Sequence, residues 1–341
     1  EIELRALLAG NDVMLFPQDP VKAIARIKQA VDSNEVDRAV IDQKCLKLLR
    51  AKEWAGLNAL KHVEIKDLYA DLNTAHGKLL RRNLYANAIT ALNDHYKVIP
   101  VGRVDTLRIA SLVIGDTIGN PFQVGLQRYA SVELFRCDKA LKRDALEALL
   151  RQLKGFDRVV VSVHNTTYRV QKEFGVPESA MDIVREVAAQ TPTIFALFAN
   201  PYKLSQAYGA HHLASVLVAY EETEETQDLM AQAIFGALNI SGRLPITASS
   251  FYARGDGRDL KANGRFTYTL PEAIGMRSAD LKGIDAIVNE GIKSQAYPGC
   301  EVLVAVDGQV VMNKAYGYTT YEKKRAVQPS DIYDLASVTK V

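Results

Sequence analysis

The sequence predicts an α/β protein built around a mostly parallel sheet. Two observations support this fold class: five apolar runs of strand length recur through the middle of the 341-residue chain, and amphipathic stretches of helical length separate them. Buried parallel strands are continuous apolar runs, and strands that alternate with helices form parallel sheets with helices on both faces. We therefore expect a three-layer α/β sandwich over residues 99–252, flanked by other segments on both sides.

Composition excludes several classes of protein. The chain has 42 Lys+Arg against 40 Asp+Glu, and 48% of its residues are hydrophobic, as in an ordinary globular protein. This balance does not predict a nucleic-acid surface, and no apolar run approaches the roughly 20 residues that a membrane span needs. The three cysteines, Cys45, Cys137 and Cys300, are too few and too far apart for a disulfide framework or a zinc site. No nucleotide-binding loop is present, which makes a nucleotide-binding function a weak interpretation. We expect no cofactor and no metal.

The first segment, residues 1–98, is expected to hold the end of an α/β barrel followed by a helical linker. Val13–Phe16 is a short apolar run bounded by turn residues, as expected of a buried parallel strand. Asp19 and Pro20 are suited to the N-cap and first position of a helix. The apolar face of that helix would hold Val21, Ile24 and Ile27. One strand cannot form a sheet by itself, so a helical domain with one isolated strand is the alternative.

Two more helices are expected in this segment. One follows Ser33 and Asn34 and carries an apolar side with Val36, Val40, Ile41, Cys45, Leu48 and Leu49. The other runs from about His76 to Leu92, because Leu80, Leu84, Ala88 and Leu92 recur every fourth residue.

The middle segment supplies the alternating strands and helices. The expected strands are Leu107–Ile114, Val132–Arg136, Arg158–His164, Thr193–Ala199 and Ser215–Tyr220. The expected helices lie near Lys139–Leu153, Glu178–Ala189 and Glu224–Leu238. We expect this segment to fold independently, because it holds a complete set of both elements.

Binding sites in such sheets lie at the carboxyl ends of the strands. The polar groups expected there are Gly115-Asp116-Thr117, His164-Asn165-Thr166, Asn200 and Tyr220-Glu221-Glu222. Glu221 or Glu222 is a candidate general acid, and the alternative is an acidic run that favours a helix N-terminus through the helix dipole. A histidine at a strand end, such as His164, is more often structural than catalytic. His211 and His212 are adjacent, so their side chains diverge and a metal pair is not expected.

The last part of the chain is expected to contain a linker, 253–275, and a separate segment, 276–341. A helix over Asp280–Ile292 precedes two strands, Glu301–Val306 and Val310–Ala315, joined by an Asp307-Gly308 turn that is typical of hairpins. Near the end, Ser337 and Lys340 form a Ser-x-x-Lys pair. On a helix these two positions share a face, which brings the amine within reach of the hydroxyl.

Several motifs in residues 1–250 resemble glycoside hydrolase family 3, with its β-N-acetylglucosaminidase branch most similar. The stretch from Ala6 to Asp12 with Phe16-Pro17 resembles the last barrel strand of that family. Four further motifs resemble its C-terminal α/β sandwich domain and occur in the same order: Phe198–Tyr202, Ala219–Glu221, Ala233–Gly236 and Ser241–Pro245. In the family the catalytic carboxylates of this branch lie upstream of the matching stretch, so the resemblance implies no glycosidase catalytic residue here.

Residues 276–341 resemble the N-terminal part of serine β-lactamases and penicillin-binding-protein-type hydrolases. The resemblance rests on Pro298-Gly299-Cys300, the Asp307-Gly308 turn, Gly317 and Leu335–Lys340. It implies that Ser337 is a nucleophile and Lys340 its base partner, in a motif set that is incomplete here. Because the fold of that family continues beyond this part, the hairpin at 301–315 is expected to pack against the sandwich or to pair with a second copy of the chain.

Together these features predict a fragment of a bimodular carbohydrate-active hydrolase, and we expect the fragment alone to be inactive. The parent would hydrolyse N-acetylglucosaminides of cell-wall or related glycans, with a serine hydrolase appended. Its expected partner is a glycan, with no nucleic acid and no membrane span, and its expected location is the bacterial cell envelope or the exterior. A non-catalytic carbohydrate-binding or interaction domain and a small-ligand or nucleotide-binding protein are the alternatives.

Overall fold

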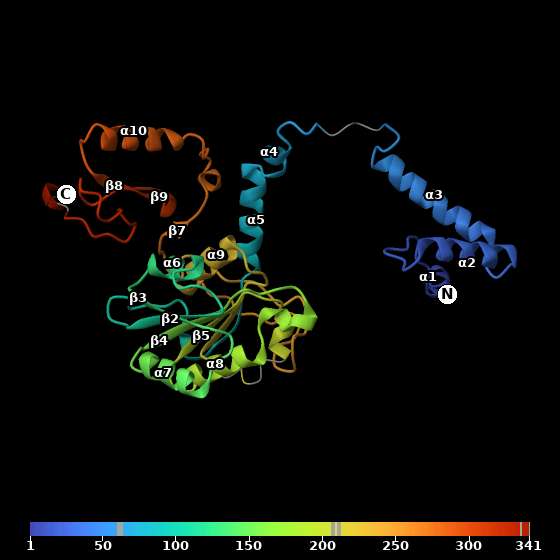
Figure 1. Ribbon diagram of the computed structural model, residues 1–341, viewed down its shortest axis with the longest axis horizontal. Helices are drawn as coiled ribbons and strands as arrows, with labels where there is room; N and C mark the ends of the chain where they lie inside the picture. The colour runs from blue at the N-terminus through green and yellow to red at the C-terminus, as the bar shows by residue number, and fades with distance from the viewer. Residues whose placement is uncertain (60–63, 206–208, 210–212, 335, 341) are drawn as a thin grey trace. The chain divides into compact units, whose positions relative to one another are not determined.

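The computed structural model of the chain divides into two compact units, Glu1–Asp71 and Leu72–Val341 (Figure 1). It describes residues 1–59, 64–205, 209, 213–334 and 336–340. Within these residues, no helix has both the length and the apolar character needed to cross a bilayer.

The first unit is helical. It contains α1 (Ile2–Leu8), α2 (Pro20–Asp32) and α3 (Arg38–Trp54), and α4 (Leu68–Leu72) lies at the junction of the two units. The predicted cap of α2 is present, since an Asp19 carboxylate oxygen accepts a hydrogen bond from the backbone N–H of Lys22 at 3.1 Å. A small core joins α1 to α2 through Leu4, Leu7, Ala30 and Val36.

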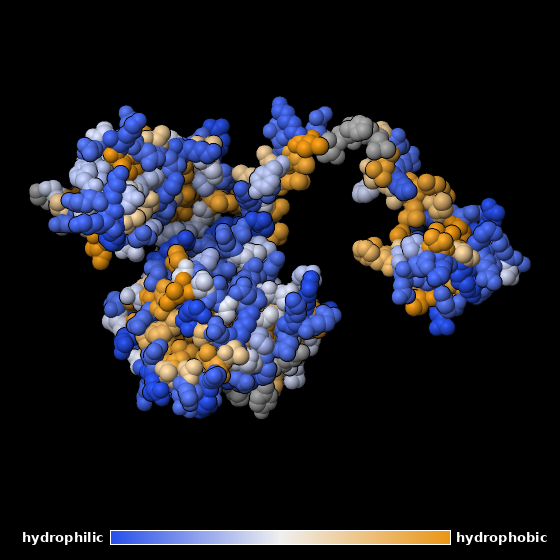
Figure 2. Space-filling view, in the orientation of Figure 1, coloured by the Kyte–Doolittle hydropathy of each residue, from blue (hydrophilic) through white to orange (hydrophobic). Residues whose placement is uncertain are grey.

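The expected strand over Val13–Phe16 is wrong, because this run is irregular backbone with Leu15 and Phe16 exposed by 83% and 92%. A strand is stabilised by pairing with other strands, and the described residues of this unit contain none. The expected apolar face of α2 is confirmed only at Ile27, which packs against the small core. It is wrong at Val21 and Ile24, which are exposed, and the buried residues of α2 are Ala23 and Ala30. The small alanine side chains allow α1, which the sequence did not indicate, to pack closely on α2. Hydrophobic side chains consequently appear on the surface of this unit in Figure 2.

The second unit is organised by a six-stranded sheet with the order β1-β6-β5-β4-β2-β3. All five expected parallel strands are present: β2 (Ile109–Ile114), β3 (Val132–Cys137), β4 (Arg158–Val163), β5 (Thr193–Leu197) and β6 (Ser215–Val218). The sixth strand, β1 (Thr90–Asp94), pairs antiparallel with β6 at the edge. The expected helix His76–Leu92 therefore ends earlier, as α5 (Ala75–Ala88), and Leu92 belongs to β1. The sheet thus begins before residue 99, where the sandwich was expected to start.

Helices cover both faces of the sheet, which confirms the three-layer α/β class (Figure 1). The helices α6 (Pro121–Gln127) and α9 (Glu224–Ile234) pack on each other over one core, and α7 (Arg143–Leu153) and α8 (Glu178–Ala188) pack over the other. The two cores share no residue because successive side chains of each strand point to opposite faces. Of these helices, the sequence did not indicate α6.

The C-terminal part of this unit contains the expected helix and hairpin. These are α10 (Lys282–Lys293), β8 (Gly299–Val306) and β9 (Gln309–Gly317), with a short strand β7 (Thr267–Tyr268) parallel to β9. Asp307 and Gly308 both have positive φ, 49° and 76°, as the two-residue hairpin turn requires. Gln232 on α9 exchanges two hydrogen bonds with the Tyr268 backbone, at 2.9 and 3.0 Å, so β7 connects the hairpin to the sandwich. Pairing with a second copy through 301–315 stays a prediction.

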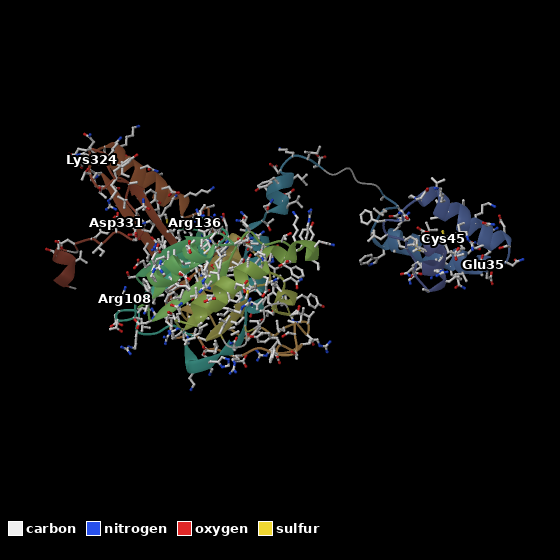
Figure 3. The ribbon with its side chains drawn as sticks, turned by 60° about the horizontal axis from the view of Figure 1, so that its bottom comes forward. Glu35, Cys45, Arg108, Arg136, Lys324 and Asp331 are labelled. Carbon is white, nitrogen blue, oxygen red and sulfur yellow. The ribbon has the colours of Figure 1, made fainter. Side chains whose placement is uncertain are left out.

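All three cysteines are free thiols. Cys45, on α3, is exposed among the side chains of the helical unit (Figure 3), Cys137 at the end of β3 is buried, and Cys300 on β8 is partly exposed.

Candidate functional site

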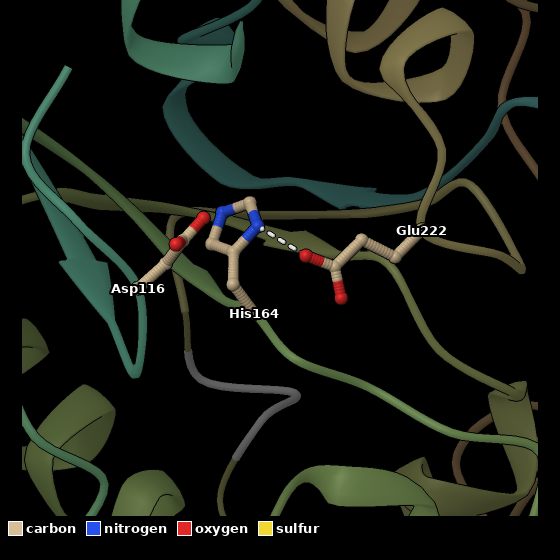
Figure 4. A group of neighbouring side chains, drawn as sticks. All are labelled: Asp116, His164 and Glu222. Carbon is tan, nitrogen blue, oxygen red and sulfur yellow. Dashed lines mark hydrogen bonds and ion pairs between the residues drawn. The ribbon is translucent and has the colours of Figure 1, made fainter. Parts of the chain in front are cut away.

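Three of the expected polar groups meet at the carboxyl end of the sheet. Asp116 follows β2, His164 directly follows β4, and Glu222 follows β6 (Figure 4). Carboxyl ends of parallel strands lie along one edge, so residues distant in sequence come together there. A carboxylate oxygen from each acid and a ring nitrogen of His164 all lie within 4.8 Å of one another.

Glu222 and His164 form a buried pair. Nδ1 of His164 lies 2.9 Å from Oε1 of Glu222, and their side chains are 0% and 17% exposed. The other carboxylate oxygen accepts a hydrogen bond from the backbone N–H of Thr166 at 2.7 Å. Burial by itself would raise the pKa of Glu222, but the hydrogen bonds from His164 and Thr166 outweigh it and lower the pKa to about 2. Glu222 is therefore ionised at neutral pH, which does not suit the expected role of general acid.

The other ring nitrogen of His164 faces two donors. Nε2 lies 2.9 Å from the hydroxyl of Ser162 and 3.3 Å from the amide nitrogen of Asn120. With donors on this side and a carboxylate on the other, the proton of a neutral ring is on Nδ1. The Asn120 amide also donates to Asp116 at 3.1 Å, and its oxygen caps α6 by accepting from the backbone N–H of Gln123 at 3.0 Å. The network thus connects the ends of β2, β4 and β6.

Ser162, His164 and Glu222 have the hydrogen-bond order of a hydrolytic triad. Ser162, however, lies within β4 and is fully buried. A nucleophile must reach its substrate, so this arrangement is structural in the conformation described. The expectation of a structural His164 agrees with these contacts.

The cluster does not suit a metal ion. Asp116 approaches the Nε2 side of the His164 ring and Glu222 the Nδ1 side (Figure 4). An imidazole binds one metal ion through one nitrogen, and a ligating nitrogen must have a free lone pair. Because donors face Nε2 and a carboxylate faces Nδ1, the residues do not converge on one ion.

Glu221 points to a different partner. The Tyr85 hydroxyl on α5 donates to Oε2 of Glu221 at 2.7 Å, and burial together with this carboxylate raises the pKa of Tyr85 to about 12. The acidic residues that favour a helix N-terminus through the helix dipole are instead Glu224 and Glu225, which lie in the first turn of α9. Both Glu221 and Glu222 line a cavity of about 650 Å³, together with Leu84, Tyr85, Ala88, Asn165, Thr166, Thr167, Tyr168, Phe198, Ala199, Asn200, Ala219 and Tyr220.

Sequence reasoning identified Asp116, His164 and the glutamates but missed Asn120 and Ser162. The signal for Asn120 was present, because Asn followed by Pro begins a helix as N-cap and first residue. Ser162 lies two positions before His164, so both side chains point to the same face of β4.

The other expected site residues lie outside this cluster. Ser337 is exposed on the short 3₁₀ helix Ala336–Lys340. The side chain of Lys340 lies outside the described part of the structure, as do His211 and His212. The serine–lysine pair therefore stays a prediction.

Comparison with known families places two matches on the chain. Residues 17–294 match the glycosyl hydrolase family 3 C-terminal domain, and residues 284–341 match the beta-lactamase family. Among curated proteins, one from Formosa agariphila named as a beta-xylosidase is 20% identical over 266 residues, which are 71% of this chain and 35% of that protein. Protein flp of Staphylococcus aureus is 37% identical over 57 residues, 17% of this chain and 11% of that protein.

Among solved structures, a glycoside hydrolase family 3 β-N-acetylglucosaminidase from Paenibacillus is similar with a TM-score of 0.51 and 18% identity. The match covers 72% of this chain and 47% of that structure. This similarity supports the fold. The chain spans less than half the length of each of these relatives.

Proposed function

The chain belongs to the family of glycosyl hydrolase family 3 C-terminal domains, and from this we infer that it is the sandwich-bearing part of a longer glycosidase. The observation that carries the inference is the match over residues 17–294, which includes the whole six-stranded sheet. We propose that the parent hydrolyses the O-glycosidic bond of N-acetylglucosaminides in cell-wall or related glycans.

The state of the carboxylates supports an accessory role for this chain. Glycoside hydrolysis uses two carboxyl groups that flank the scissile bond, one of which must be a proton donor. Glu222 is held as an anion by His164 and Thr166, and the carboxylate of Glu221 accepts from Tyr85. We therefore propose that the catalytic carboxylates belong to another part of the parent and that the 341-residue chain alone is inactive.

The substrate is tested with the parent protein. Nitrophenyl β-N-acetylglucosaminide and nitrophenyl β-xyloside represent the activities named for the Paenibacillus and Formosa relatives. We expect a higher kcat/KM for the N-acetylglucosaminide than for the xyloside. A preference for the xyloside would overturn the proposed substrate but not the proposed glycosidase activity. Turnover of neither sugar would overturn both proposals.

We propose further that the C-terminal segment belongs to a serine hydrolase, in which Ser337 is the nucleophile and Lys340 its base partner. The beta-lactamase-family match over 284–341 supports this role. A glycosidase joined to such a hydrolase suits a polymer with both glycan and peptide parts, so we place the parent in the bacterial cell envelope or outside the cell. Labelling of the parent by a fluorescent penicillin, lost in Ser337→Ala, is the expected result. Equal labelling of both proteins would contradict the role of Ser337.

A non-catalytic carbohydrate-binding domain is the second candidate. The cavity lined by Tyr85, Phe198, Tyr220 and both glutamates favours it, because aromatic side chains with polar neighbours are typical of small-ligand sites. Binding of a neutral oligosaccharide by a parent that shows no turnover would favour this candidate.

A further inference from the structure

A second cavity at the same edge of the sheet is lined by positive charge. Its volume is about 600 Å³, and its lining consists of Lys139, Asn165, Thr167, Tyr168, Arg169, Lys172, Gly175 and Pro177. Three of these residues are cations and none is acidic. Across the described residues, no ion pair includes Lys139, Arg169 or Lys172, whereas neighbouring carboxylates have partners of their own: Glu173 pairs with Lys203, Glu178 with Arg185, and Glu222 with His164.

Lys139 is held in place by the backbone. Its ammonium group donates to the carbonyl oxygens of Asn165 at 2.9 Å and Gly175 at 2.7 Å. An ammonium group has three N–H donors, so one stays available for a ligand. Burial lowers the pKa of Lys139, although the charge of Glu222 acts in the opposite direction. The lysine is thus a fixed, partly buried cation that forms no ion pair with the described residues, although Glu222 is close enough to act on its charge.

The cavity also lies where the sheet topology favours a ligand. The strands β2 and β4 are neighbours in the sheet. The chain leaves β2 toward β3, on the side of β2 away from β4, and it leaves β4 toward β5, on the side of β4 away from β2. The loops after β2 and β4 therefore separate, and ligands of open α/β sheets bind in the crevice at this point. The cavity shares Asn165, Thr167 and Tyr168 with the cavity that contains Glu221 and Glu222, so a larger ligand has adjoining space.

We propose that the cavity lined by Lys139, Arg169 and Lys172 binds an oxyanion, either a carboxylate or a phosphate. Arg169 can present two parallel N–H donors to such a group, and the two lysines add compact charges. This binding proposal does not rest on the proposed glycosidase function of the parent.

Calorimetry on the 341-residue chain tests the proposal with three probes: inorganic phosphate, the acidic disaccharide cellobiouronic acid, and neutral cellobiose. We expect at least one acidic probe to bind at least about tenfold more tightly than cellobiose, because a charge-assisted hydrogen bond contributes about a factor of ten. The binding should weaken as salt is raised. Tighter binding of the sugar acid would identify a glycan carboxylate as the source, and tighter binding of phosphate would identify free phosphate.

The variants Arg169→Gln and Lys172→Gln should each weaken acidic-probe binding about tenfold. Lys142→Gln is the matched control: it removes one exposed charge next to α7, does not line the cavity, and should leave the affinity unchanged. Because Arg169 and Lys172 are exposed, both variants should fold, which circular dichroism verifies. Equal affinity for acidic and neutral probes, failure of both acidic probes to bind, or unchanged affinity in both cavity variants would overturn the proposal.

Discussion

His164 is a fully buried histidine whose two ring nitrogens have partners of opposite kind. Glu222 accepts from Nδ1, whereas the Ser162 hydroxyl and the Asn120 amide face Nε2. Each polar group in the network is therefore satisfied by another, which is what a buried polar cluster requires. The network connects the ends of three strands, and its main contribution is to the geometry of this edge of the sheet.

Replacing His164 tests that contribution. His164→Phe keeps a planar ring but leaves the Glu222 carboxylate without its main partner, so we expect a loss of about 3 kcal/mol in the free energy of unfolding. Ser162→Ala removes a smaller contact and should cost about 1 kcal/mol. Urea unfolding gives both values, and amide exchange of β4 and β6 shows whether the loss is local. A change of His164→Phe below that of Ser162→Ala would contradict the structural role.

Acid should destabilise the sandwich through Glu222. Its pKa is about 2 in the folded chain and 4.5 in the unfolded reference. The ionised carboxylate therefore contributes its full stabilisation above pH 4.5, and this contribution is lost as pH falls toward 2. Other acids in the chain also have lowered pKa values, so the comparison is with Glu222→Gln. The variant should be less stable at pH 7 and should lose less stability between pH 4.5 and 2. Parallel stability curves would show that Glu222 does not titrate in this way.

At the level of elements, the parallel strands were predictable because they are buried on both faces. Val159–Val161, for example, are all fully buried and form a continuous apolar run. The edge strand β1 was not predictable in the same way. Leu92 continues the fourfold spacing of α5, and only pairing with β6 shows that it is extended. Residues Val13–Phe16 have the composition of a strand but do not form one, because the described part of their unit contains no strand with which they could pair.

The strand pattern of the sequence predicted the edge of the sheet where the site lies but not the contacts within the site. Asp116, His164 and Glu222 follow strands, so a parallel sheet brings them together. The partners of Nε2 of His164 include Asn120, and this residue is positioned by α6. The helix α6 is too short to produce a clear periodic pattern in the sequence.

The role of β1 leads to a prediction about fragments. Residues 72–275 keep α5 and β1, whereas residues 99–252 remove both and expose the paired edge of β6. An unpaired edge strand recruits other chains, so the shorter fragment should aggregate or unfold without cooperativity. The longer one should give a single cooperative thermal transition, measured by circular dichroism. Equal cooperativity and solubility of the two fragments would show that the sandwich begins after β1, as the sequence suggested.

At the scale of the whole molecule, the two family matches overlap over residues 284–294, which include most of α10. One covers the sandwich, and the other covers the hairpin that β7 connects to it. The chain thus belongs to the glycosyl hydrolase family 3 C-terminal domains, and a segment similar to the beta-lactamase family follows. The chain's own acidic residues at the sheet edge have structural partners, which is why we propose that glycosidase catalysis belongs to another part of a longer protein.

The most direct test of this account is the release of nitrophenol from nitrophenyl β-N-acetylglucosaminide by the 341-residue chain. We expect no turnover above the uncatalysed rate, both for this chain and for its Glu221→Gln/Glu222→Gln double variant. Turnover by the chain that disappears in the double variant would contradict it, because the sandwich carboxylates would then be catalytic.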